Sequence, residues 1–103
     1  MAFDGTEGSQ ITLADGATMT AAHRIANPNA KLGHFMGKDI LNQILSQAGC
    51  MGIRTYHGLN SNGERELVLV GVDANENDMV SGIVADKANP CPPLPPTLNS
   101  LNS

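Results

Sequence analysis

The segment that most constrains the fold of this chain is residues 50–73, which has the pattern of a β-hairpin. Residues 51–57 alternate between two kinds of side chain, as expected for a strand that is buried on one face. Residues 67–72 form a continuous apolar run with three β-branched residues, which predicts a strand buried on both faces at the centre of a sheet. Asn62-Gly63 between the two runs is a strong hairpin signal, because both residues tolerate a positive φ.

An isolated hairpin is marginal in water, so other elements must cover its apolar face. Residues 39–48 carry apolar side chains four positions apart, which predicts an amphipathic helix that ends at Gly49. Residues 12–26 predict a second helix, because Thr12 can cap its first turn and Pro28 follows its end. These two helices are the expected cover for the sheet.

The remaining apolar segments are short. Residues 31–36 alternate loosely, which favours a short edge strand. Residues 79–86 predict another strand, or a helical turn followed by a strand, with Ile83 and Val84 in the core. The expected class is therefore α+β: a small antiparallel sheet around the central hairpin, with both helices packed on one face.

Composition divides the chain into three segments. Residues 1–11 are weakly patterned and predict an irregular lead-in, whereas residues 12–88 predict a single α+β domain. Five of the six prolines follow residue 88, so residues 89–103 predict a Pro-rich tail that is neither helix nor central strand. The length of 103 residues fits one domain with a modest core.

Charge and hydropathy bear on partners and location. The net charge is −4, the pI is about 5.1, and the six Lys and Arg residues are scattered. Nucleic-acid binding rests on clustered basic residues, so we expect no nucleic-acid partner. No apolar run approaches the roughly 20 residues that cross a bilayer, and the N-terminus has no signal-peptide pattern. We therefore expect no membrane insertion and a cytoplasmic location.

Two runs, residues 44–58 and 67–75, together with the later Cys91-Pro92-Pro93, resemble a set of small uncharacterised bacterial proteins. The resemblance covers residues 12–93. It implies a compact bacterial domain, and it implies no activity, cofactor or site residue.

The polar turn at residues 73–78 begins like a calcium-binding loop, with oxygen-bearing side chains at its first, third and fifth positions. The later positions do not match a calcium-binding loop. Asp78 occupies the sixth position, where glycine allows the sharp turn, and Val84 occupies the twelfth, where a bidentate glutamate is needed. A turn whose side chains bond their own backbone is the expected structure. The weak metal candidates are Asp73, Asn75, Asn77 and Asp78.

Cys50, at the expected helix-to-strand junction, is a candidate reactive thiol. A nucleophilic cysteine needs a histidine base, yet His57 is seven residues along an extended chain at ~3.3 Å per residue. His23 and His34 approach only through the fold. The alternative interpretation is a small buried hydrophobic residue. Cys50 and Cys91 are expected to be free thiols, with a disulfide or a shared metal site as the alternatives.

The tail contains a segment that resembles a proline-rich ligand for an aromatic-lined groove. The other interpretation is a stiff tail that lies across its own domain. The candidate interaction residues are Cys91, Pro92, Pro93, Leu94, Pro95 and Pro96.

Three functions follow from these patterns. The first is a non-enzymatic structural or interaction module that self-associates into a homo-oligomer or a larger assembly, because the core is thin and strand edges are exposed. The second is a small-ligand or metal-binding domain that uses residues 73–78. The third is a thiol enzyme that uses Cys50. We expect no cofactor, self-association as the main interaction, and an unidentified protein partner for the tail.

Overall fold

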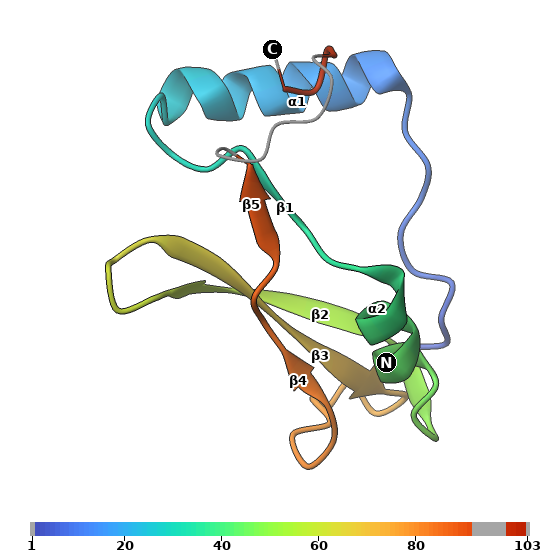
Figure 1. Cartoon of the computed structure of the whole chain (residues 1–103). Coiled ribbons are helices and arrows are strands. Elements are labelled where there is room, and N and C mark those ends of the chain that lie inside the picture. The colour runs from blue at the N-terminus through green and yellow to red at the C-terminus, as the bar shows by residue number, and fades with distance from the viewer. Residues whose placement is uncertain (1, 92–98, 103) are drawn as a thin grey trace. The chain divides into compact units, whose positions relative to one another are not determined.

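The computed structural model describes residues 2–91 and 99–102, with the backbone alone described at residues 89–91. Its elements are α1 (Leu13–Ala26), β1 (Gly33–Phe35), α2 (Lys38–Leu45), β2 (Cys50–Leu59), β3 (Arg65–Asp73), β4 (Val84–Ala85) and β5 (Asn89–Cys91) (Figure 1). The fold class is α+β, as the sequence predicts.

The chain divides into two compact units. The first comprises Met1–Gly8 and Met36–Ala88, and the second comprises Ser9–Phe35 and Asn89–Ser103. This division differs from the three consecutive segments that composition predicts, because each unit combines segments that are distant in sequence.

In the second unit, α1 begins where the sequence predicts. The Asp15 N–H donates a hydrogen bond of 3.0 Å to Thr12 Oγ1, so Thr12 caps the helix. The helix ends at Ala26, just before Asn27 and Pro28. None of its 14 residues is buried. The sequence thus predicts the position of α1 correctly, but no face of this helix is buried.

The second unit also contains a two-stranded antiparallel sheet. The expected strand over residues 31–36 is confirmed as the shorter β1, which pairs with β5 so that Gly33 lies opposite Cys91. Arg24 Nη1 donates to the Leu101 carbonyl oxygen at 2.8 Å, which ties α1 to the end of the described chain.

In the first unit, α2 packs against β2 and β3 and buries Ile44 completely (Figure 1). The predicted packing of a helix on one face of the sheet is therefore seen for α2, whereas α1 belongs to the second unit. The helix stops at Leu45, three residues earlier than predicted. The Gln47 backbone N–H and side-chain Nε2 both donate to the Ile44 carbonyl oxygen, at 3.4 and 2.9 Å, so the chain turns away. Gly49 then adopts a φ of +82°.

The sheet of the first unit has the strand order β2-β3-β4, with all neighbours antiparallel. The expected central position of the run at residues 67–72 is confirmed, because β3 lies between the other two strands. Ile53 lies opposite Gly71, and Leu59 lies opposite Arg65 at the hairpin end. A register shift between Cys50 and Gly52 marks a bulge at the start of β2.

The hairpin loop differs in detail from the expected turn. Gly63 has a φ of +79°, but Asn62 does not adopt a positive φ. The Gly63 N–H donates to the Asn60 carbonyl oxygen at 2.9 Å, and Asn60 Oδ1 accepts the N–H groups of Asn62 and Glu64. Asn60 thus fixes the loop, and only the glycine of the Asn-Gly pair supplies a positive φ.

The prediction that Val84 is a core residue is wrong. Val84 is exposed, whereas Ala85 is buried and lies opposite Leu69. Ile83 packs against the core as predicted. Because side chains alternate across a strand, Ile83 and Ala85 share the inner face and Val84 must point outward.

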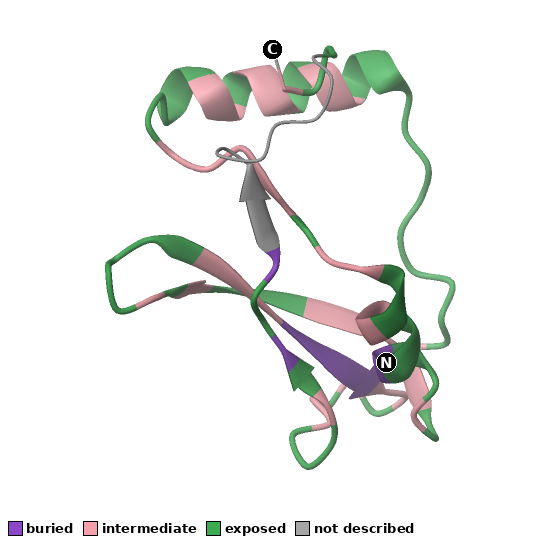
Figure 2. Cartoon of the chain, in the orientation of Figure 1, coloured by how far each residue is buried: buried purple, intermediate pink, exposed green. Residues whose placement is uncertain are grey.

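The core of the first unit is centred on Ile44, Leu69 and Ala85. Val70 and Val72 are buried on the opposite face of β3, because they alternate with Leu69. Figure 2 shows this concentration of buried residues on β3. The expectation that this strand is buried on both faces is confirmed.

Candidate functional site

A hollow of about 580 Å³ lies beside β2 in the first unit, a volume within the range of ~300–1,000 Å³ typical of ligand pockets. Its lining comes from four parts of the unit: Phe3, Gly5 and Glu7 in the N-terminal segment, Leu45 at the end of α2, residues 51–55 of β2, and Val72 of β3. Phe3 is held in place because its N–H donates to the Ala74 carbonyl oxygen at 3.0 Å.

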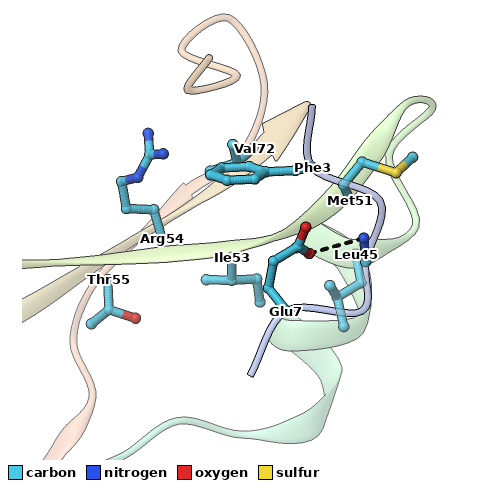
Figure 3. A pocket seen from close by; sticks show the side chains of 10 residues that line it. Phe3, Glu7, Leu45, Met51, Ile53, Arg54, Thr55 and Val72 are labelled. Carbon is cyan, nitrogen blue, oxygen red and sulfur yellow. Dashed lines mark hydrogen bonds between the residues drawn. The ribbon is translucent and has the colours of Figure 1, made fainter. Parts of the chain in front are cut away.

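The hollow extends along the edge of β2. Figure 3 shows Arg54 on one side of the strand with Phe3, and Ile53 on the other side with Leu45. Consecutive side chains of a strand lie on opposite faces of the sheet. The hollow touches side chains on both faces of β2, Arg54 on one and Ile53 on the other. It therefore follows the edge of the strand and is not confined to one face.

A charged and hydrogen-bonded cluster lies on the Arg54 side of the strand. Asp78 accepts from Tyr56 Oη and from Arg54 Nη1, both at 2.5 Å. Arg54 also places its guanidinium carbon 5.9 Å from the centroid of the Phe3 ring, within the range of a cation–π contact. Arg54 and Tyr56 share a face because they are two residues apart on β2.

The position of Asp78 follows from backbone pairing. Asp78 forms a bridge with Val72, and the Met79 N–H beside it donates to the Gly71 carbonyl oxygen at 2.8 Å. The hydrogen bond from Tyr56, followed by the one from Arg54, holds the pKa of the Asp78 carboxyl below its ordinary value of 3.8. The carboxylate is thus fixed as an anion that ties β2 to the loop after β3.

The pH dependence of stability should reveal this carboxylate. Because the folded pKa of Asp78 lies below its unfolded value, the group stabilises the fold above about pH 4, and this stabilisation disappears as pH falls through the folded pKa. We expect Asp78→Asn to flatten the fall in the free energy of unfolding below pH 4, measured by urea titration with circular dichroism.

The exposed Asp86 supplies the matched control, so Asp86→Asn should leave the acid limb of that curve unchanged. Some slope must remain in Asp78→Asn, because hydrogen bonds from Thr6 also lower the pKa of Asp4. If the free energy of unfolding falls as steeply below pH 4 in Asp78→Asn as in the original chain, Asp78 is not a source of that fall.

The loop at residues 73–78, the weak metal candidate, forms backbone-capping bonds. Asp73 Oδ1 accepts the N–H groups of Asn75 and Asn77, at 2.9 and 3.0 Å. Glu76 has a φ of +69° within the turn. Asp78 points to Arg54 and Tyr56. Within residues 2–91 and 99–102, no cluster of three or more His, Cys, Asp or Glu side chains is arranged to hold a metal ion.

Cys50 lies at the start of β2, half-buried, as a free thiol that donates to the Gly52 carbonyl oxygen at 3.2 Å. It also packs against the core. His57 is exposed further along the same strand. His23 and His34 belong to the second unit, where His23 Nε2 lies 3.2 Å from the Lys31 carbonyl oxygen.

The candidate interaction segment in the tail mostly lies outside the described residues. The backbone of Cys91 pairs with Gly33 in the β1–β5 ladder. The other candidates, Pro92, Pro93, Leu94, Pro95 and Pro96, are not among the residues that the structure describes.

Sequence reasoning missed the site beside β2. The shared face of Arg54 and Tyr56 is visible in the strand pattern, but Asp78 joins them from 22 and 24 residues away. Phe3 was assigned to an unpatterned lead-in, and its single backbone bond to Ala74 leaves no local sequence signal.

Comparison with known proteins adds no relative: no family model, no curated protein and no solved structure matches this chain. Across the described parts of the chain, neither helix has the length and apolar character required to cross a bilayer.

Proposed function

We propose that this protein is a non-enzymatic interaction module that self-associates into a homo-oligomer. The observation that carries the proposal is the balance of apolar side chains. Six hydrophobic residues are buried in the described chain, whereas eleven large hydrophobic residues are exposed. Where such side chains lie together, exposed apolar surface marks sites at which proteins associate.

The exposed apolar residues occur in both units. In the second unit, α1 exposes Leu13, Met19 and Ile25, the last at 83%. In the first unit, Leu59 at the tip of the hairpin is 74% exposed, and Leu45 beside the hollow is 47% exposed. Burial of a large aliphatic side chain contributes roughly 1.5–3 kcal/mol, so covering even a few of them by a second copy stabilises a small fold appreciably.

The proposal includes a cytoplasmic location and a bacterial source. The free thiol of Cys50 supports the location, because cysteines are usually unpaired in a reducing compartment.

The mass in solution tests the proposal. We expect light scattering across a wide concentration range to give a discrete multiple of 10.8 kDa. High salt should not dissociate the oligomer, because apolar contacts are not screened as surface charges are. A mass of 10.8 kDa at every concentration would overturn the proposal.

A further inference from the structure

The outer edge of β2 is unpaired in the first unit. The strand has ten residues and stands at one end of the order β2-β3-β4, and among the described residues it pairs only with β3. An edge strand presents a row of backbone donors and acceptors that can pair with another chain. Proteins often protect such edges with proline, charged side chains or a bulge. β2 has no proline or lysine, its bulge lies at its start before Gly52, and Arg54 is its one Lys or Arg residue.

The hydrogen-bonding register shows which backbone groups face outward. The Asn60 N–H donates to the Glu64 carbonyl oxygen at 2.9 Å, so residues 60 and 64 form a hydrogen-bonded pair. Such pairs alternate along an antiparallel ladder, so the even-numbered residues of β2 bond to β3. The bond from Met79 N–H to the Gly71 carbonyl oxygen agrees, because Gly71, opposite Ile53, bonds away from β2. The outward-facing residues are Ile53, Thr55, His57 and Leu59.

We propose that this edge pairs antiparallel with the same edge of a second copy, with Tyr56 of each copy beside the two-fold axis. The inference rests on the proposed function, self-association, and assigns its interface. A two-fold contact uses the same surface on both subunits, so the edge must be complementary to itself. The result is a continuous six-stranded sheet across the dimer.

The register centred on Tyr56 pairs all four outward-facing residues. It places Thr55 opposite His57 of the partner subunit, and Ile53 opposite Leu59 of the partner subunit. Leu59 is 74% exposed, and Ile53 lines the hollow together with Leu45 on the same side of the strand (Figure 3). The hollow at the edge of β2 is thus positioned to receive the partner's Leu59.

The same register separates like charges. Arg54 lies opposite Gly58 of the partner subunit, so the two arginines do not face each other across the new ladder. Centring the pair on Thr55 would place the partner's Leu59 against the bulge before Gly52. Centring it on His57 would leave Ile53 beyond the end of the partner's strand. The register centred on Tyr56 pairs the outward-facing groups most completely.

Disulfide trapping tests the register. In a background of Cys50→Ala and Cys91→Ser, a Tyr56→Cys variant would bring two thiols directly opposite each other in a non-hydrogen-bonded pair, at a Cα separation of ~4.5 Å. Disulfides form at Cα separations of ~4.4–6.8 Å. The matched Thr55→Cys variant would hold its thiols on a diagonal of ~7–8 Å, which is too far. We expect most Tyr56→Cys chains to cross-link on mild oxidation and few Thr55→Cys chains to do so.

A proline variant tests the edge independently. Because the Thr55 N–H faces outward, Thr55→Pro removes a donor from the edge and leaves the ladder with β3 intact. We expect Thr55→Pro to shift the mass to that of a monomer with its circular dichroism spectrum retained. Thr55→Val, which keeps the N–H, should remain an oligomer.

The outcomes separate the two proposals. A background variant that is monomeric at every concentration overturns both. An oligomer in which Tyr56→Cys does not cross-link, or in which Thr55→Cys cross-links as well as Tyr56→Cys, leaves self-association standing and overturns this interface. An oligomer in which Tyr56→Cys cross-links and Thr55→Cys does not supports the interface. Disulfide trapping does not depend on the proline variant, so the interface is still tested if Thr55→Pro misfolds.

Discussion

Replacing Ile44 by alanine is expected to lower the free energy of unfolding of the first unit by about 2–5 kcal/mol. Ile44 is the one described side chain that is completely buried, and it packs against Leu69 and Ala85. Truncation would remove its apolar contacts and leave a cavity between α2 and the sheet. Because small domains have a total stability of only about 5–15 kcal/mol, the variant should be partly unfolded at moderate temperature.

Urea titration followed by the fluorescence of Tyr56 measures this loss, because the chain has a single tyrosine and no tryptophan. Ile25→Ala is the matched control, since it deletes the same atoms from a helical side chain that is 83% exposed. The control should change stability by no more than about 0.5 kcal/mol. Equal urea midpoints for the two variants would contradict the central position of Ile44 in the core.

Replacing Gly82 by alanine should cost about 1–3 kcal/mol, although its backbone conformation suits an alanine. The added methyl group would collide with the Gln47 side-chain oxygen. That oxygen accepts the Ile83 N–H at 2.9 Å, and the same amide donates to the Ile44 carbonyl oxygen at 2.9 Å. Displacing Gln47 therefore breaks two bonds that connect the end of α2 to the approach to β4.

A double-mutant cycle isolates this mechanism. In a Gln47→Ala background the collision is absent, so Gly82→Ala should be much less costly there than in the original chain. Urea midpoints of the four variants give the coupling between the two positions. Additive effects would show that Gly82 is constrained by something other than Gln47, for example the Met79 carbonyl oxygen near the same point.

The sequence predicts the elements of the fold well where the pattern is local. The helix cap at Thr12, the central position of β3 and the hairpin all follow from short stretches of side chains, and the structure confirms them. The early end of α2 was not predicted, because it depends on the amide of Gln47 bonding backward to Ile44. A polar residue that continues a helical pattern does not reveal such a bond.

The candidate site was not predictable to the same extent, because its groups come together only through the sheet. Asp78 was considered as an oxygen ligand of its own loop, since neighbouring residues in sequence were the only visible partners. In the fold it turns to Arg54 and Tyr56, which the pairing of β2 with β3 brings within reach. Likewise, the hollow beside β2 depends on where Phe3 lies, and Phe3 is held by a backbone bond to Ala74 and by the contact of its ring with Arg54, both distant in sequence.

The arrangement of the two units also has a consequence for synthesis on the ribosome. Every described helix and strand of the first unit precedes residue 89, so all the segments of its core are made before β5. β1 is made early, but its partner β5 begins only at residue 89. β1 therefore remains without its ladder until residues 89–91 have been made, after the last strand of the first unit.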